Sequence, residues 1–545
     1  MLLHVQNLSI SAGKKQLLKQ VSFQIDAGET LAVVGQSGSG KSITSLALMG
    51  LLPSALKITE GTILFNGESL YANTANQWRA LRGSKISMIF QEPMTSLNPL
   101  MQCGTQVAEV LVLHEKLSFS EAKEKVIAIF KEVKLHRPEV IYNSYPHEIS
   151  GGQKQRVMIA MALACNPQLI IADEPTTALD ASVQYEIVQL LSELQQRRGC
   201  SILFITHDLS LARAISHHTL VMRSGEVVEY NTTTQLFESP REPYTKALLQ
   251  CRPSVHHKAE WLPSIDEVLN NNTVQYHFPE KPLEDRSILE VNNLSVWYEK
   301  SGLWPGSKKS FQALHNISFA VKKGETLALV GESGSGKTTL GKTLLRMEEN
   351  RTQGSVKYNG QEILGLSRRE FSASFAPLMQ MVFQDPYASL NPQHTIGEAI
   401  MEPMQVHGLY KTRKECRDKA MELLEKVGLN AMHFNRYPHE FSGGQRQRIV
   451  IARALALNPE FIILDESVSA LDVSVQAQIL NLLKQLQLEF GITYLFITHD
   501  LKVVRFIAGK VLVLKNGELI EFSSADDVFS TPKAEYTQQL LRYSE

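Results

Sequence analysis

The chain repeats itself, and this internal repeat limits its possible folds more than any other feature of the sequence. GETLAVVGQSGSGKS (28–42) returns as GETLALVGESGSGKT (324–338), and YPHEISGGQKQR (145–156) returns as YPHEFSGGQRQR (437–448). The spacing between matching strings stays nearly constant along the chain. The sequence therefore predicts two duplicated domains that differ by small loop insertions.

The ends of the repeat set the domain boundaries. FESPREPYTKALLQ, late in the first copy, matches FSTPKAEYTQQLLR near the C-terminus. We therefore expect one domain at residues 1–250 and a second at residues 288–545. The segment 251–287 has no counterpart after the second copy and contains several prolines and a run of asparagines. It is predicted to be an irregular linker.

Composition narrows the functional classes. The net charge of -1 gives no bulk basic charge, so no nucleic-acid partner is expected. The N-terminus lacks the basic stretch and apolar core of a signal peptide. No apolar run approaches the roughly 20 residues of a membrane helix. Any role at a membrane is therefore expected to be peripheral.

The pattern within each copy predicts a mixed α/β fold. The apolar runs LAVV (31–34), LIIA (169–172) and SILFI (201–205) are typical of buried parallel strands. The opening of each copy is typical of an antiparallel strand layer. AKEKVIAIFKEVKL (122–135) has helical spacing of its apolar residues, and it lies in a helical insert expected around residues 92–150.

Both copies contain the phosphate-loop pattern GxxxxGK[ST] between a predicted strand and a predicted helix. Small residues let backbone N–H groups curl around phosphate oxygens, and the following helix points its positive end at the same anion. The lysine is expected to reach the β- and γ-phosphates, and the final hydroxyl to hold Mg²⁺. Repetition in the same context favours this interpretation over a flexible glycine turn. The residues are Gly35, Gln36, Ser37, Gly38, Ser39, Gly40, Lys41 and Ser42, and Gly331, Glu332, Ser333, Gly334, Ser335, Gly336, Lys337 and Thr338.

Paired acids end one apolar strand of each copy. LIIADE places Asp173 and Glu174 at a strand tip, and FIILDE does the same for Asp465 and Glu466. The aspartates are expected to act on Mg²⁺, and the glutamates to orient and polarise an attacking water. An acidic strand end facing solvent is the alternative, but the fixed position between SGGQ and a His-Asp pair favours catalysis.

The string SGGQ, present in both copies, resembles the signature of the ATP-binding-cassette family. The resemblance covers nearly the whole chain and implies ATP and Mg²⁺ as cofactors, with two tandem P-loop NTPase cores. Each core has a mainly parallel sheet, an antiparallel β layer and a helical subdomain. Physically, SGGQ begins a helix whose free N–H groups and partial positive charge suit a γ-phosphate. The family places the signature of one copy across from the phosphate loop of the other. The residues are Ser150, Gly151, Gly152 and Gln153, and Ser442, Gly443, Gly444 and Gln445.

The same resemblance assigns further positions in each copy. Gln91 and Gln384 match the glutamine that senses Mg²⁺ and contacts the membrane partner. His207 and His499, both within FITHDL, match the histidine that contacts the γ-phosphate and the catalytic water. A lone histidine after a strand is usually structural, but the shared context favours function.

The resemblance also covers the adenine-stacking position and the loop that links the two sites. Tyr298 matches the aromatic residue that stacks on adenine, whereas Ala12 occupies this position in the first copy. Weaker ATP binding is therefore expected at the first phosphate loop. The strings ALD at 178–180 and 470–472 match the loop that links the two sites.

The flanking strings point to one branch of the family. SLNP, YPHEFSGGQRQR and PYTKALL resemble the ATPases of peptide and nickel importers. This resemblance implies two membrane permease subunits and, indirectly, an external solute-binding protein as partners. It places the chain peripherally on the cytoplasmic face of a bacterial inner membrane. The alternative is a soluble tandem-cassette ATPase acting on ribosomes, whose domains are joined by a long charged helical arm that this linker does not resemble.

Overall fold

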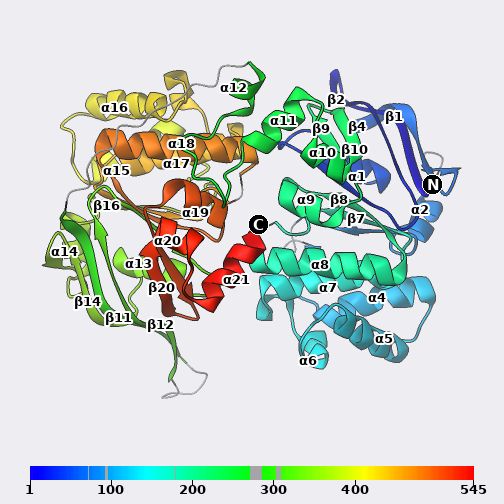
Figure 1. Cartoon of the computed structure of the whole chain (residues 1–545), viewed down its shortest axis with the longest axis horizontal. Helices are drawn as coiled ribbons and strands as arrows, with labels where there is room; N and C mark the ends of the chain where they lie inside the picture. Colours follow the sequence, from blue (N-terminus) through cyan, green and yellow to red (C-terminus); the bar gives the residue numbers. More distant parts are fainter. Residues whose placement is uncertain are drawn as a thin grey trace. The chain divides into compact units, whose positions relative to one another are not determined.

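The computed structural model describes residues 1–70, 73–91, 96–177, 179–270, 285–301, 308–469 and 471–544. The chain divides into two compact units, Met1–Gln250 and Cys251–Glu545 (Figure 1). Each unit has its own sheet structure and its own hydrophobic cores.

The first unit combines an antiparallel layer, a mainly parallel sheet and a set of helices. Its strands are β1 (Leu3–Ala12), β2 (Lys15–Ile25), β3 (Thr30–Gly35), β4 (Leu56–Phe65), β5 (Glu68–Ser69), β6 (Ile86–Ile89), β7 (Leu169–Asp173), β8 (Ser201–Ile205), β9 (His218–Arg223) and β10 (Glu226–Thr232). Its helices are α1 (Lys41–Leu48), α2 (Ala75–Leu81), α4 (Cys103–Glu115), α5 (Phe119–Glu132), α6 (Pro138–Asn143), α7 (Gly151–Leu163), α8 (Ala181–Arg198), α9 (Leu209–Ile215), α10 (Thr233–Glu238) and α11 (Pro243–Gln250).

The parallel sheet of this unit has the strand order β10-β9-β3-β8-β7-β6. The strands from β9 to β6 pair in parallel, and β10 adds an antiparallel edge. The three apolar runs predicted to be buried strands lie in β3, β7 and β8, so that prediction is confirmed. The antiparallel layer has the order β2-β1-β4-β5.

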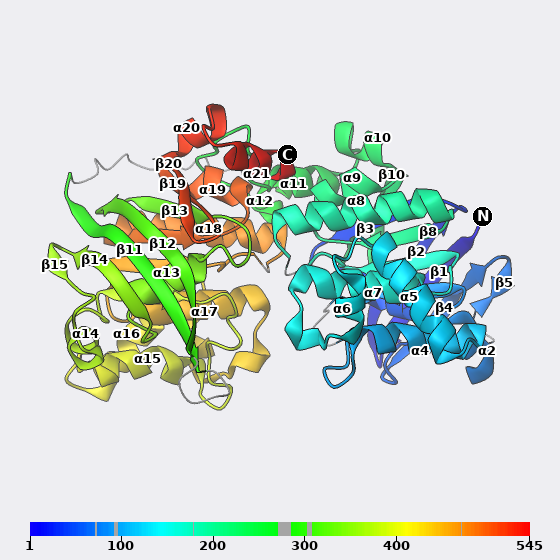
Figure 2. The same cartoon turned by 90° about the horizontal axis from the view of Figure 1, so that it is seen from below.

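The predicted helical insert is present as α4, α5 and α6, grouped beside α7 in Figures 1 and 2. Helix α5 contains most of the string 122–135 that has helical spacing, and it starts at Phe119, before that string. Ser118 and Glu121 form a reciprocal capping box there, which fixes the helix start three residues earlier. The helix ends at Glu132, before Lys134 adopts a left-handed conformation (φ 57°).

Alternate residues of β7 face two different cores. Leu169 and Ile171 pack with the antiparallel layer and α1, whereas Ile170 and Ala172 pack with the helical insert, α7 and α8. Both faces of the strand are therefore buried, and its tip is held in place from both sides.

The second unit repeats this plan. Its strands are β11 (Ser287–Ser301), β12 (Lys308–Lys322), β13 (Thr326–Val330), β14 (Arg351–Tyr358), β15 (Gln361–Glu362), β16 (Met379–Val382), β17 (Phe461–Asp465), β18 (Thr493–Ile497), β19 (Lys510–Lys515) and β20 (Glu518–Ser524). Its helices are α12 (Ile265–Leu269), α13 (Lys337–Leu344), α14 (Arg368–Ser374), α15 (Ile396–Val406), α16 (Arg413–Lys426), α17 (Gly443–Leu455), α18 (Val473–Phe490), α19 (Leu501–Ile507), α20 (Ala525–Ser530) and α21 (Glu535–Ser544).

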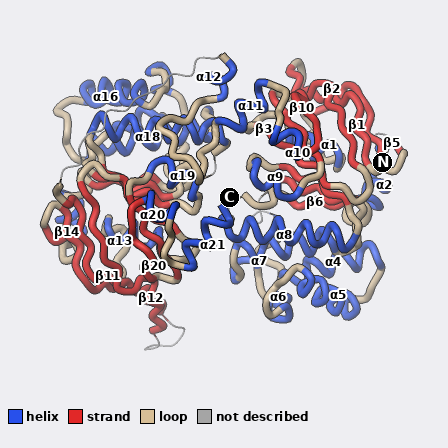
Figure 3. The backbone as a smooth tube through the Cα atoms, viewed as in Figure 1, coloured by secondary structure: helices blue, strands red, loops and turns tan. Residues whose placement is uncertain are grey.

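The strands of this unit run in the order β15-β14-β11-β12-β20-β19-β13-β18-β17-β16. One bridge between His315 and Glu518 joins the antiparallel layer to the rest. Figure 3 shows β11, β12 and β14 gathered apart from α15, α16 and α18 within this unit. Among the helices that the structure describes, none combines the length and apolar composition needed to cross a membrane.

The described part of the segment 251–287 packs against the second unit. Leu262 is buried in the core that contains α18. The Asn481 side chain donates to the Leu262 carbonyl (2.7 Å) and accepts from its N–H (3.2 Å). Lys484 Nζ donates to the Glu260 carbonyl (3.0 Å), and α12 follows behind a capping box formed by Ser264. The segment was predicted to be irregular, and it contains this short helix together with a fixed attachment point.

Substitution of Asn481 by alanine should loosen this attachment. The change leaves the buried N–H and C=O groups of Leu262 without their partner, which costs about 1–3 kcal/mol per unsatisfied group. Hydrogen–deuterium exchange at the Leu262 amide should therefore speed up. Gln189 occupies the matching position of α8 and is exposed, so Gln189→Ala is the control and should leave exchange unchanged. Unaltered exchange in Asn481→Ala would show that other contacts hold the segment.

Candidate nucleotide-binding sites

Each phosphate loop is a left-handed turn between a buried strand and a helix. In the first unit the loop joins β3 to α1, and Gly40 has a φ of 104°. A Cβ at Gly40 would clash with Leu18, so only glycine fits. Gly336 has a φ of 102° at the start of α13, and a Cβ there would meet Leu314. No side chain caps the start of α1 or of α13, which leaves these helix ends suited to an anion.

The loop lysine of each unit is buried and bonded to the loop backbone. Lys41 Nζ donates to the carbonyls of Gly35 (2.8 Å) and Gln36 (3.0 Å). Lys337 Nζ donates to those of Gly331 (2.7 Å) and Glu332 (2.8 Å). Both ammonium groups are therefore held inside the curve of the loop.

The predicted metal-binding hydroxyl and carboxylate lie together in each unit. Ser42 Oγ donates to Asp173 Oδ1 (3.3 Å), and Thr338 Oγ1 donates to Asp465 Oδ1 (3.3 Å). Burial raises the pKa of both aspartates above the ordinary value, although these hydrogen bonds oppose the rise. A hydroxyl beside a carboxylate is a donor set that suits Mg²⁺.

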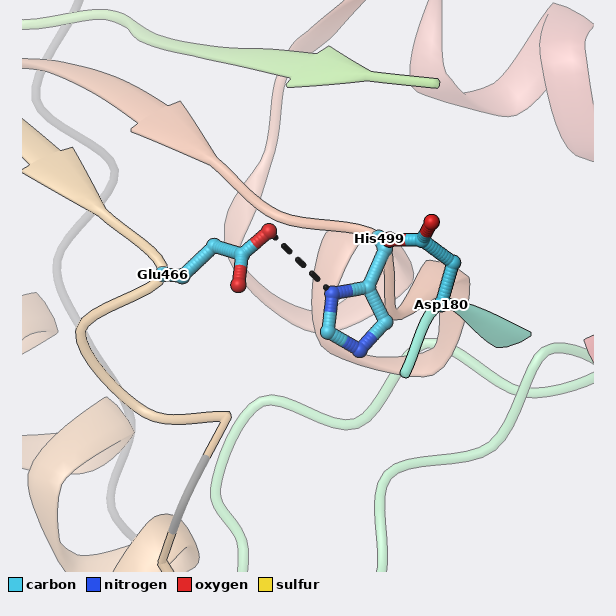
Figure 4. Close-up of side chains that lie close together, drawn as sticks. All are labelled: Asp180, Glu466 and His499. Carbon is cyan, nitrogen blue, oxygen red and sulfur yellow. Dashed lines mark hydrogen bonds and ion pairs between the residues drawn. The ribbon is translucent and has the colours of Figure 1, made fainter. Parts of the chain in front are cut away.

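The predicted glutamine, glutamate and histidine also converge. Glu174 Oε2 accepts from Gln91 Nε2 (3.0 Å) and lies 3.1 Å from His207 Nδ1. Glu466 repeats the arrangement. Its Oε2 accepts from Gln384 Nε2 (2.8 Å), and its Oε1 lies 3.3 Å from His499 Nδ1 (Figure 4).

The backbone directs both glutamates. Glu174 and Glu466 have positive φ values of 46° and 45°, and their N–H groups donate to Ile205 and Ile497 (2.9 Å each). The strand therefore ends in a sharp turn that is tied to the tip of the neighbouring strand. Each glutamate leaves the sheet in the same direction in both units, toward its glutamine and histidine.

The signature residues cap their own helix. Ser150 Oγ accepts from the Gln153 N–H (3.3 Å), and Gln153 Oε1 accepts from the Ser150 N–H (3.0 Å). Ser442 and Gln445 form the same box with distances of 3.4 and 3.1 Å. Ser150, Gly151, Ser442 and Gly443 are exposed, so the start of each helix faces outward.

Known proteins resemble the chain over most of its length. The family model described as "ABC transporter" matches residues 18–177 and 314–469. The glutathione import ATP-binding protein GsiA of Escherichia coli (strain K12) is 45% identical, over 99% of this chain and 89% of that protein. GsiA of Pectobacterium atrosepticum is 44% identical, over 98% and 88%.

The chain belongs to the ABC transporter family. It is an ATPase with two ABC regions. A model described as "Oligopeptide/dipeptide transporter, C-terminal region" matches residues 228–275. A solved ATP-binding cassette, MJ0796 bound to ADP and phosphate, is 30% identical over 42% of this chain and 98% of its own, with a TM-score of 0.39.

Tyr298, the residue predicted to stack on adenine, is part of a polar network. Tyr298 Oη donates to Glu348 Oε2 (2.8 Å) and lies 3.2 Å from Thr339 Oγ1. Glu348 also pairs with Lys342 (2.9 Å). In the repeat, apolar residues replace all four members of this network in the first unit: Ala12, Ile43, Leu46 and Leu52. The two units therefore differ in polarity at this corner.

Other contacts of these groups were not predicted from the sequence. Thr177 Oγ1 donates to Glu174 Oε2 (2.9 Å), whereas its counterpart Ser469 donates to the Glu466 carbonyl (2.9 Å). Ser45 Oγ donates to Asp173 Oδ2 (3.0 Å), and Gly341 replaces it in the second unit. A comparison of the two copies, position by position, could have revealed these residue differences from the sequence. The family positions Ala178 and Ala470 lie outside the described residues.

Glu174 and His207 shift each other's pKa. Burial favours a higher pKa for Glu174, but His207 and Thr177 hold its pKa below the ordinary value of 4.5. Burial favours a lower pKa for His207, but Glu174 raises its pKa above the ordinary value of 6.5. Both shifts favour a carboxylate paired with an imidazolium.

The stability difference between the wild type and His207→Gln should therefore depend on pH. The pair stabilises the fold fully between pH 4.5 and 6.5. Its contribution is lost as the pH falls through the lowered pKa of Glu174 or rises through the raised pKa of His207. The difference in melting temperature should be largest near pH 5.5, by the same linkage, and should shrink by about pH 9. The exposed His136→Gln is the control. An equal difference at both pH values would contradict the pairing.

Proposed function

We propose that each unit binds one MgATP and hydrolyses it to drive import of peptide-like compounds. The observation that carries this proposal is the convergence of Gln91, Glu174 and His207, repeated by Gln384, Glu466 and His499. A buried carboxylate between an amide and an imidazole can orient a water and accept its proton. Lys41 and Lys337 act electrostatically on Glu174 and Glu466, and they supply charge for the phosphates.

The proposed nucleotide contacts follow from the geometry of the loops. Residues 35–42 and 331–338 wrap the phosphates with backbone N–H groups, and Lys41 and Lys337 bind the β- and γ-phosphates. The signature residues Ser150–Gln153 and Ser442–Gln445 add N–H groups from a helix start. Tyr298 stacks on adenine at one site.

The proposed Mg²⁺ ligands are a hydroxyl, an aspartate and a glutamine in each copy. The hydroxyl–carboxylate hydrogen bonds described above support the first two. Mg²⁺ prefers oxygen ligands and keeps several waters, so two or three protein oxygens suffice. The residues are Ser42, Asp173 and Gln91, and Thr338, Asp465 and Gln384.

The cargo class rests on the relatives. Proteins 44–45% identical over nearly the whole chain are named for glutathione import, and residues 228–275 match an oligopeptide and dipeptide transporter region. We therefore propose short peptides or peptide-like molecules as cargo. Two permease subunits and an external solute-binding protein complete the proposed transporter, with this chain peripheral on the cytoplasmic face of a bacterial inner membrane.

The proposed domain limits are residues 1–250 and 288–545, each one nucleotide-binding domain, with 251–287 connecting them. The first compact unit ends at Gln250, which supports the first limit. The ribosome-acting alternative gains no support from the relatives, because those reported above are named for import.

Replacing both catalytic glutamates should separate binding from turnover. Glu174→Gln combined with Glu466→Gln keeps the shape of the side chain and one acceptor oxygen but removes the negative charge and the base. We expect kcat to fall about 100-fold or more while ATP binding is retained. Steady-state ATPase assays and equilibrium ATP titrations measure the two effects. Normal turnover in the double variant would remove the catalytic assignment.

Partner recovery from membranes tests the transport role. A tagged chain isolated from membranes in mild detergent should bring down permease subunits in stoichiometric amounts. The Glu174→Gln, Glu466→Gln double variant should recover at least as much, because it holds ATP without hydrolysing it. Recovery of the chain on ribosomes, free of membrane proteins, would support the alternative function instead.

A further inference from the structure

A tyrosine in the last helix of each copy reaches the phosphate loop of that copy. Tyr244, on α11, donates from Oη to Gln36 Oε1 (3.2 Å). Tyr536, on α21, accepts at Oη from the Glu332 N–H (3.2 Å). Gln36 and Glu332 are both the second residue of their loop. Both tyrosines are buried, with exposed fractions of 3% and 7%.

Matching contacts hold both tyrosines in place. In the first unit, the buried Glu229 carboxylate accepts from the N–H groups of Arg241 (3.0 Å) and Glu242 (3.2 Å), just before α11. The Arg223 guanidinium lies 4.8 Å from the centre of the Tyr244 ring. Glu229 and Arg223 belong to β10 and β9, and β9 pairs with β3 in the same sheet. The strand that leads into the loop and the strands that hold Tyr244 in place therefore belong to one sheet.

The second unit makes the same kinds of contact with the corresponding residues of its own sequence. The Glu521 carboxylate accepts from the N–H groups of Lys533 (3.1 Å) and Ala534 (3.2 Å), just before α21. Lys515 Nζ lies 4.4 Å from the centre of the Tyr536 ring. The copies thus keep the carboxylate, the cation and the tyrosine, although the atom that the tyrosine contacts has changed.

The loop residue that each tyrosine contacts also accepts a hydrogen bond from the loop lysine. The Gln36 carbonyl accepts from Lys41 Nζ (3.0 Å) and from the Ser39 N–H (3.1 Å). The Glu332 carbonyl accepts from Lys337 Nζ (2.8 Å) and from the Ser335 N–H (3.1 Å). A shift of this residue would therefore displace both the ammonium group and the loop backbone.

We infer that Tyr244 and Tyr536 are positioning residues that fix the phosphate loops in the shape that binds ATP. This inference rests on the proposed function of the loops. The tyrosine ring alone would satisfy packing, since phenylalanine fills the same space beneath the same cation. The hydroxyl adds a directional restraint on the loop residue whose carbonyl accepts a hydrogen bond from the lysine. When the loop is already held in its binding shape, ATP binding loses less conformational entropy in the loop.

Removing both hydroxyls from the full chain tests this inference. In Tyr244→Phe combined with Tyr536→Phe, the loss of one hydrogen bond per loop should raise the Kd and the KM for ATP about two- to ten-fold. The kcat should stay within about two-fold, because the catalytic glutamates and histidines are untouched. Equilibrium ATP titration and steady-state ATPase assays in Mg²⁺ supply the values.

The next residue along each helix provides a matched control. Thr245 and Thr537 are buried, and their hydroxyls have no hydrogen-bond partner among the described residues. Thr245→Val with Thr537→Val removes a neighbouring hydroxyl without touching the loop, and should leave the Kd and KM unchanged. An equal rise in KM in this control would assign the effect to helix packing and overturn the inference.

A further variant separates this inference from the function on which it rests. Lys41→Ala with Lys337→Ala should abolish ATP binding if the loops are the ATP sites. If that variant loses binding while the phenylalanine variant keeps a wild-type Kd and KM, the tyrosines have no positioning role. Retained ATP binding in the alanine variant would instead reject the proposed sites themselves.

Discussion

Parallel pairing of β3, β7 and β8 is the constraint on which each site depends. Parallel strands end at the same edge of a sheet, so the phosphate loop after β3, the acids at the tip of β7 and the histidine after β8 meet there. The second unit achieves the same with β13, β17 and β18. Burial of β7 on both faces stops the strand from sliding, and a slip of one residue would exchange the directions of Asp173 and Glu174.

Much of this arrangement could be predicted from the sequence because its signals are local. A glycine-rich loop after an apolar run, and two acids after another, each reveal their own backbone context. Parallel pairing then places them together without further information. Gln91 was assigned only by its family position, and its contact with Glu174 was not predicted, although the geometry places the two side chains within hydrogen-bonding distance.

Other features depend on residues that are distant in the sequence, and no local pattern reveals them. Gln36 and Tyr244 are separated by most of the first unit, yet they are in contact. Asn481 holds Leu262 from a helix more than two hundred residues later. The start of α5 lies before the string with helical spacing for a different reason: the apolar spacing locates the helical face, whereas the capping box of Ser118 determines where the helix begins.

The turns after β7 and β17 are built from different residues in the two copies. Pro175 follows Glu174, whereas Ser467 follows Glu466 and keeps a buried hydroxyl without a hydrogen-bond partner among the described residues. Proline favours an extended conformation with negative φ for the residue before it. Glu174 nevertheless has a φ of 46°, so the contacts around the first glutamate hold its backbone against that preference. Glu466 has a φ of 45° before a serine, which imposes no such preference, so the same turn costs less free energy in the second copy.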